Sequence, residues 1–182
     1  MKTKKKIFLL VFSILTAGSI TCFAQDPGIT LNETGLPDSA LFDFWIGEWD
    51  LWWNDSDNTV GTGKNVVMKI LNNKVISENF IALSGNLKGF EGNSYSLLDL
   101  QSNQWKQTWV DTDGSYLDFY GKTENDKRIF GRSYSDPYRK MVIQRMVFYD
   151  IAPDTFTWNW EISFDKGNNW ELLWQIHYER EK

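Results

Sequence analysis

The residues best suited to chemistry lie in two parts of the chain, around positions 105–120 and toward the C-terminus. Trp105, Gln107, Trp109 and Asp111 occupy alternate positions, and such alternation places side chains on one face of a strand. Aromatic rings can stack on sugar rings, while amides and carboxylates bind hydroxyl groups. The pattern therefore indicates either a carbohydrate-binding face or a solvated outer face.

Two tyrosines follow this stretch, beyond the turn signal Asp113-Gly114. A two-residue turn would place Tyr116 and Tyr120 on the same face as the tryptophans, where a phenol could transfer protons. A three-residue loop would place Leu117 and Phe119 there instead. Because a shift of one residue exchanges the two faces of a strand, the sequence leaves both registers open.

Arg145 is the most informative polar residue nearer the C-terminus. A four-residue loop at 151–154 would set Arg145 opposite Trp160, and a five-residue loop at 165–169 would set Trp160 opposite Trp174. This register predicts that Arg145 lies inside the protein. A buried charge is costly unless it is paired. The arginine is therefore either a structural residue, held by an aromatic ring or a carboxylate, or an anchor for an anionic group of a ligand.

The same alternation predicts which side of the C-terminal hairpin is buried. Trp158, Trp160, Trp174 and Tyr178 share one face, whereas the reverse face is polar and carries His177. A sheet with one buried side requires an apolar face backed by a polar one. We therefore expect the tryptophans to face the interior and His177 to face solvent.

Glu78 interrupts the apolar alternation of Ile76, Phe80 and Ala82. It is either an inward-facing acid or a sign that the other face of its strand is buried, and the sequence leaves both readings open.

The elements that position these residues are short strands. Apolar runs alternate with turn clusters at intervals of roughly ten residues, which is typical of sandwiches and barrels. No stretch keeps a helical period, and the β-branched and aromatic content favours strands. The predicted strands cover residues 47–54, 62–71, 74–83, 92–99, 104–111, 115–122, 127–134, 140–150, 155–164 and 169–180.

Ten antiparallel strands rarely stay in an open sheet, and closure removes the exposed edges. We therefore predict an all-β fold, an antiparallel up-and-down β-barrel of about ten strands. The short apolar turn before Gly47 is expected to plug its base. A barrel of this size can hold a small ligand, although the ten tryptophans are bulky enough to fill it.

Residues 1–24 are predicted to be a signal peptide, because four early lysines precede an apolar core and the small residue Ala24. The apolar core is short for a membrane span. We therefore expect an exported protein, periplasmic or secreted. Lipid anchoring through Cys22 is the less favoured reading, because Thr21 is bulky for the position before a lipidated cysteine.

After the signal peptide, residues 25–40 are predicted to form an extended leader, and 41–182 a single barrel domain. The chain has a formal net charge of −5 at pH 7, and removal of the lysine-rich signal makes it more acidic. Such a surface repels nucleic acid and anionic lipid. A small molecule is therefore the expected partner.

Gly47-x-Trp49, at the start of the first predicted strand, resembles the opening motif of the lipocalins and the wider calycin group. In those proteins the tryptophan closes the base of the barrel and a late arginine packs across it. The resemblance implies that Arg180 stacks on Trp49. The segment FDFWIGEW, together with Leu98-Asp99 and Thr108-Trp-Val-Asp111, resembles an uncharacterised family of bacterial lipocalin-like proteins. This resemblance implies the fold of the chain but says little about its activity.

Nitrobindins, ten-stranded barrels that bind haem, are a more distant resemblance. They carry glycines after the Gly-x-Trp motif and a histidine ligand near the C-terminus. Here Leu51 and Trp53 stand at the glycine positions, and His177 falls on the polar face. We therefore predict no haem, no other cofactor and no metal site.

The favoured function is binding of a small ligand, most simply a saccharide fragment, in an aromatic cavity lined by Trp109, Asp111, Trp158, Trp160 and Trp174. The alternative is a cofactor-independent lyase or dehydratase acting on acidic, uronate-containing oligosaccharides. Arg145 would hold the carboxylate and Tyr116 or Tyr120 would move the proton. A third possibility is an accessory barrel whose interior is filled.

Overall fold

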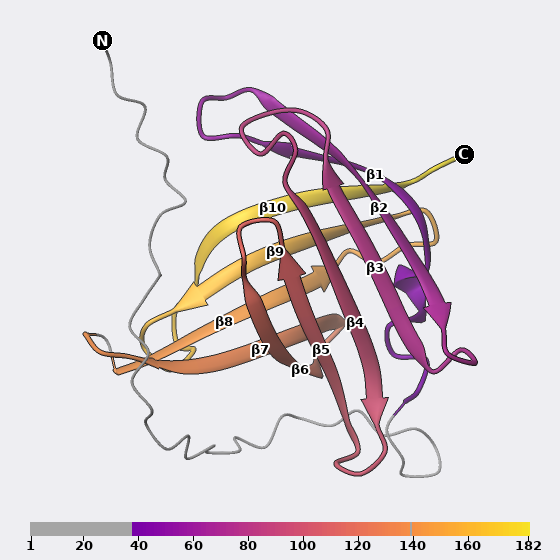
Figure 1. The fold of residues 1–182 in the computed structure, drawn as a ribbon. Helices are drawn as coiled ribbons and strands as arrows, with labels where there is room; N and C mark the ends of the chain where they lie inside the picture. Colours follow the sequence, from indigo (N-terminus) through magenta and orange to yellow (C-terminus); the bar gives the residue numbers. More distant parts are fainter. Residues whose placement is uncertain (1–37, 139) are drawn as a thin grey trace.

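The computed structural model describes residues 38–138 and 140–182, which form a closed barrel of ten antiparallel strands (Figure 1). Each strand pairs with its neighbour in the chain, and β10 closes the barrel on β1. The predicted fold class is confirmed. The strands are β1 (Gly47–Asn54), β2 (Val60–Ile70), β3 (Val75–Ala82), β4 (Glu91–Asp99), β5 (Gln104–Asp111), β6 (Tyr116–Glu124), β7 (Lys127–Asp136), β8 (Lys140–Tyr149), β9 (Thr155–Ser163) and β10 (Glu171–Arg180).

The predicted signal peptide, Cys22 and most of the predicted leader lie outside the described residues. No helix in the described ranges is long and apolar enough to cross a membrane.

The turns form where the sequence places asparagine and glycine. Asn72, Asn73, Asn125, Gly114 and Gly167 all have positive φ, a backbone region that glycine, and to a lesser extent asparagine, occupies at low cost. These residues reverse the chain between neighbouring strands, so the hairpin pattern follows from local turn chemistry.

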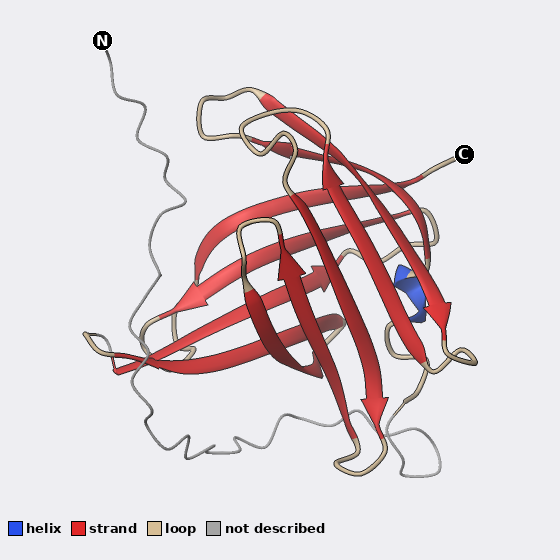
Figure 2. Cartoon of the chain, in the orientation of Figure 1, coloured by secondary structure: helices blue, strands red, loops and turns tan. Residues whose placement is uncertain are grey.

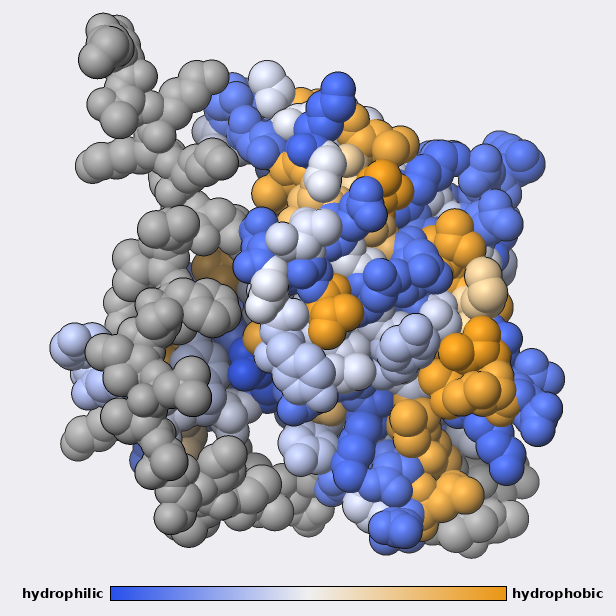
Figure 3. All heavy atoms as spheres, viewed as in Figure 1, coloured by the Kyte–Doolittle hydropathy of each residue, from blue (hydrophilic) through white to orange (hydrophobic). Residues whose placement is uncertain are grey.

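Alternation separates an apolar interior from a mixed exterior. In β1, Trp49, Leu51 and Trp53 are buried while the residues between them are exposed. Polar side chains cover much of the face seen in Figure 3, and apolar side chains occur there in separate patches. The interior is therefore the core of the molecule.

A single helical turn, η1 (Asp43–Trp45), closes one end of the barrel, which we call the base (Figure 2). Phe42 stacks on Phe130 with ring centroids 4.2 Å apart, and Trp45 packs edge-on against Phe148 at 5.2 Å. Trp49 Nε1 donates a hydrogen bond to the Trp45 carbonyl, 2.9 Å away. The predicted plug is confirmed.

Arg180 lies across the same end. Its guanidinium is 4.2 Å from the centroid of the Trp49 ring, and its Nη1 donates to the Ile46 carbonyl at 3.1 Å. A Cβ at Gly47 would lie 2.0 Å from this Nη1. The glycine of the Gly-x-Trp motif therefore leaves room for the arginine, and the predicted stacking of Arg180 on Trp49 is confirmed.

Two registers were uncertain or wrong at the sequence level. Between β5 and β6, Gln107 pairs with Phe119, so the three-residue alternative is the correct one. Between β8 and β9, Tyr149 pairs with Thr157 rather than Phe156, and Arg145 with Glu161 rather than Trp160. The physical reason lies at Asp150, which has a positive φ of 52°. The chain reverses there with one residue more than predicted, so the residues of β8 that were expected to face inward face outward.

Candidate functional site

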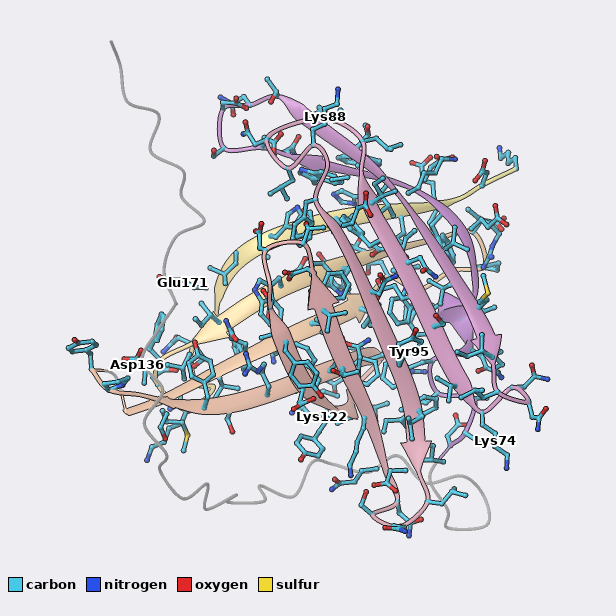
Figure 4. All side chains as sticks on the ribbon, viewed as in Figure 1. Lys74, Lys88, Tyr95, Lys122, Asp136 and Glu171 are labelled. Atoms are coloured by element: carbon cyan, nitrogen blue, oxygen red, sulfur yellow. The ribbon has the colours of Figure 1, made fainter. Side chains whose placement is uncertain are left out.

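The candidate site is the interior at the end of the barrel opposite η1, which we call the mouth. Inward-facing residues of β1 to β5 are mostly buried, whereas several on β6 to β10 are partly exposed. Asp136 and Glu171, labelled in Figure 4, lie at the ends of β7 and β10 on this side. The inner faces of β6 to β10 are therefore less completely buried than those of β1 to β5. The partly exposed inward residues are Leu117, Arg132, Gln144, Trp158, Trp160 and Trp174.

Tryptophans form one wall of the mouth. Trp160 pairs with Trp174 across β9 and β10, as predicted. Trp174 meets Trp53 and Trp158 edge-on, with ring centroids 5.3 Å and 5.8 Å apart, and Trp160 meets Phe119 at 5.9 Å. Edge-to-face contacts leave ring faces for other partners. The inward position of the tryptophans is confirmed, and their role in binding stays a prediction.

A polar network lies deeper in the barrel. All six of its side chains are buried, and they come from the neighbouring strands β2 to β5 and from β10, which the closure of the barrel brings near them. The members are Asn65, Glu78, Ser94, Ser96, Gln107 and Tyr178.

Glu78 is the centre of this network. Its Oε1 accepts from Asn65 Nδ2 at 2.8 Å, and its Oε2 accepts from Ser94 Oγ at 2.6 Å. Gln107 Nε2 donates to Ser96 Oγ at 2.9 Å and to Ser94 Oγ at 3.3 Å. Glu78 is therefore an inward-facing acid, which decides between the two readings of the sequence.

Burial raises the pKa of Glu78 to about 7, and the hydrogen bonds from Ser94 and Asn65 only partly oppose this. Burial also raises the pKa of Tyr178, whose hydroxyl accepts from Asn65 Nδ2 at 3.3 Å. The Glu78 carboxyl therefore titrates much closer to neutral pH than an ordinary glutamate does.

Three polar atoms near these walls are buried without a partner. Asn65 Oδ1 and Gln107 Oε1 are acceptors, and Trp174 Nε1 is a donor; none has a hydrogen bond. A buried polar atom without a partner costs about 1–3 kcal/mol.

Arg145 lies on the outer face, so the prediction that it faces the interior is wrong. Its Nε is 2.7 Å from Glu161 Oε2, its guanidinium stacks 3.7 Å from the Trp170 ring centroid, and Glu124 lies 3.9 Å away. Its charge is fully paired. The structural reading of this arginine is the correct one, though on the exterior of the barrel.

Tyr116 and Tyr120 also face outward, and both are exposed.

Trp109 and Asp111 face inward, but both carboxylate oxygens of Asp111 already accept hydrogen bonds. Its Oδ1 accepts from the backbone N–H groups of Asp113 and Ser115, both at 3.0 Å, and its Oδ2 accepts from Trp109 Nε1 at 2.9 Å. The structure therefore separates the three predicted catalytic residues from the tryptophans, and Asp111 holds the turn and orients Trp109.

His177 pairs with Thr157 on the outer face and stacks on Trp52, with ring centroids 3.9 Å apart. Its predicted outward position is confirmed.

Arg132 is an inward-facing arginine that sequence reasoning missed. It pairs with Gln144 and lies two residues beyond Phe130, which is fully buried in the core. The alternation Phe130-x-Arg132 was the signal that could have found it. An apolar anchor fixes the face of a strand more securely than counting residues through a loop does.

A surface hollow lies elsewhere, at the base. It is shallow and is lined by Asp43, Phe44, Ile151–Pro153 and Arg180, which are residues of the plug and its surroundings.

Comparison with known proteins finds no matching family model and no matching curated protein. Among solved structures, the chain is similar to a de novo designed fluorescence-activating β-barrel, with a TM-score of 0.42 and 12% identity over 79% of this chain and 98% of that one. It is also similar to a redesigned β-barrel, with a TM-score of 0.40 and 8% identity over 79% and 96% of the two chains. The lipocalin resemblance stays a prediction.

Proposed function

We propose that this protein binds a small polar ligand, a saccharide fragment, inside the barrel at the mouth. The observation that carries the proposal is the combination of partly exposed tryptophans with buried polar atoms that have no partner. Asn65 Oδ1 and Gln107 Oε1 can accept hydrogen bonds from hydroxyl groups, and Trp174 Nε1 can donate one.

A saccharide satisfies both parts of this surface. Its ring has apolar faces that stack on indole, and its hydroxyl groups both donate and accept hydrogen bonds. A purely aliphatic ligand would leave the buried acceptors without partners, which costs free energy. The expectation that the protein is exported agrees with this function, because saccharide fragments are abundant outside cells.

Thermal stabilisation by a panel of mono- and oligosaccharides, set against fatty acids and haem, tests the proposal. Ligands that bind only the folded protein raise its melting temperature by mass action. A shift with a sugar and none with the apolar panel is the expected result. A shift with fatty acids alone would overturn the saccharide assignment, and no shift with any ligand would support a filled barrel.

Two glutamines provide a matched pair of variants. Gln107→Met removes an inward acceptor, whereas Gln175→Met removes an outward amide that donates to Tyr149 Oη at 2.8 Å. Isothermal titration should show weaker sugar binding in Gln107→Met and unchanged binding in Gln175→Met. Equal losses in both variants would place the site outside the barrel interior.

A second candidate function is elimination of water from an acidic oligosaccharide. The observation that favours it is Glu78, a buried acid whose pKa near 7 suits proton transfer at neutral pH. Incubation with unsaturated uronate oligomers would lower their near-ultraviolet absorbance and reduce their mass by one water. Glu78→Gln should abolish this turnover, and turnover at the wild-type rate in that variant would exclude Glu78 as the acid or base.

A further inference from the structure

We propose that Arg132 binds an oxyanion group of the ligand, so that the interior takes anionic small molecules, carboxylated or sulfated, in preference to neutral ones. This inference rests on the proposed function, because it assigns a ligand class to the same site.

The guanidinium of Arg132 lies at the mouth, on the inner side of the barrel wall. It is 5.9 Å from the centroid of the Phe119 ring and 5.0 Å from that of Tyr134, and its Nη1 donates to Gln144 Oε1 at 3.2 Å. Phe119 also contacts Trp160, at 5.9 Å. One buried ring therefore joins the arginine to the tryptophan wall.

The charge of Arg132 has no counter-ion among the described residues. No carboxylate of these residues lies within 4.0 Å of its guanidinium, although eight such contacts are formed by other cations of the barrel. Arg145, on the outer face of the neighbouring strand, forms two of these contacts, with Glu124 and Glu161. The inward arginine is thus the one that an incoming anion would neutralise.

Burial lowers the pKa of Arg132, while electrostatic interactions with Tyr134 and Asp118 oppose the change. The direction indicates a cation that has lost hydration without gaining an equivalent partner. A guanidinium has five N–H donors in a planar fork that matches a carboxylate or a sulfate. A bound oxyanion would replace the lost hydration with charge-assisted hydrogen bonds.

The strand register connects this anion position to the polar network. Gln107 pairs with Phe119 across β5 and β6, and the Arg132 guanidinium of β7 lies 5.9 Å from the centroid of the Phe119 ring. Adjacent strands are about 4.8 Å apart, so Gln107 and Arg132 lie roughly 10 Å apart along the wall. A ligand with an anionic group at one end and hydroxyl groups at the other would meet Arg132 and Gln107 together, with the tryptophans against its ring.

The test is isothermal titration with D-glucose and D-glucuronate, which differ by one carboxylate. Wild type should bind glucuronate at least about tenfold more tightly, because hydrogen bonds between two charged groups are about twice as strong as those between neutral groups. Arg132→Gln should bind the two sugars equally, Arg132→Lys should keep part of the preference, and the outer-face control Arg145→Gln should keep all of it. Galactose 6-sulfate extends the test to sulfate.

Circular dichroism and thermal melts of each variant separate loss of folding from loss of the anion site. If a folded Arg132→Gln still prefers glucuronate, the inference is overturned while the proposed saccharide function stands. If no sugar binds but benzoate or laurate binds in an Arg132-dependent way, the saccharide assignment fails and the anion site stands. If neither sugars nor organic anions bind wild type, both are overturned.

Discussion

The base and the mouth of this barrel are both built from aromatic residues, but they are packed differently. At the base, Phe42, Trp45 and Trp49 are at most 1% exposed, and the cations there are paired: Lys69 Nζ lies 2.7 Å from Asp43 Oδ2 and Arg180 Nε 3.5 Å from Asp154 Oδ1. At the mouth, the tryptophans are partly exposed and Arg132 has no such partner. Identical residue types therefore form a core at one end and an accessible surface at the other.

The difference shows that aromatic content alone does not define a binding site. A tight stack such as Phe42 on Phe130 excludes any third group, and its contribution is to stability. Partly exposed tryptophans beside an arginine with no carboxylate partner are suited to receive a ligand. The following predictions test this division of roles, beginning with the largest expected effect.

Trp49→Ala should destabilise the protein by about 3–5 kcal/mol, the range for removing a buried aromatic side chain. It would also remove the ring on which Arg180 stacks. Trp160→Ala should cost less, because the ring is already partly hydrated. Guanidinium denaturation of both variants measures the difference, and equal losses would mean that the mouth is as completely filled as the base.

Stability should depend on pH through Glu78. Its pKa rises from an ordinary 4.5 to about 7 on folding, so between these values the folded state holds a proton that the unfolded state has lost. Stability therefore falls as the pH rises from about 4.5 to about 7, by at most about 3 kcal/mol, and this group has no further effect at higher pH.

Denaturation of wild type and Glu78→Gln across pH 4.5 to 8 checks this expectation. The variant has no titrating group at this position, so its stability should vary less in that window. Asp165 does not interfere, because hydrogen bonds from Asn169 and Ser163 lower its pKa to about 2. A slope unchanged by the substitution would show that Glu78 stays ionised in the folded barrel.

A glycine-to-alanine substitution, which adds one carbon atom, can be made at each end of the barrel. A Cβ at Gly121, near the base, would lie 2.6 Å from Trp105 Cβ and 3.2 Å from Phe42. A Cβ at Gly92, near the mouth, would lie 2.0 Å from the ring of Trp109, which is partly exposed. Gly121→Ala should cost about 1–3 kcal/mol, because its neighbours are held by the plug.

Gly92→Ala should cost less stability, because Trp109 can move toward solvent, and it should change ligand affinity instead. Thermal melts and sugar titrations of the two variants separate these effects. A larger loss of stability in Gly92→Ala would contradict the idea that the mouth is the more adaptable end.

His177→Ala should have the smallest effect, within about 0.5 kcal/mol, as is usual for surface substitutions. The imidazole stacks on Trp52, which is itself 36% exposed. Ligand affinity should not change, and a titration that shows weaker binding would mean that the outer face takes part in the site.

The fold and the plug were predictable because their signals are local. Turn residues and alternation depend on neighbours a few positions away, so the ten strands followed from the sequence. The packing of Arg180 on Trp49 is a long-range contact, and only the resemblance of Gly47-x-Trp49 to the lipocalin motif implied it. The inward position of Trp160 and Trp174 followed from the length of one loop, even though the register shifts between Leu172 and Trp174.

The candidate site depended on information that the sequence does not display locally. Asp150, which has a positive φ, lies in the reversal between β8 and β9. One extra residue in such a reversal shifts the pairing of the two strands by one position, and this shift turns Arg145 to the outer face. Arg132 then became the inward arginine. The network around Glu78 joins β2, β3, β4, β5 and β10. Successive hairpins bring β2 to β5 together, whereas Tyr178 of β10 reaches Asn65 because the barrel closes. Local chemistry thus determined the strands and their turns, while the strand registers and closure decided which polar groups share the interior.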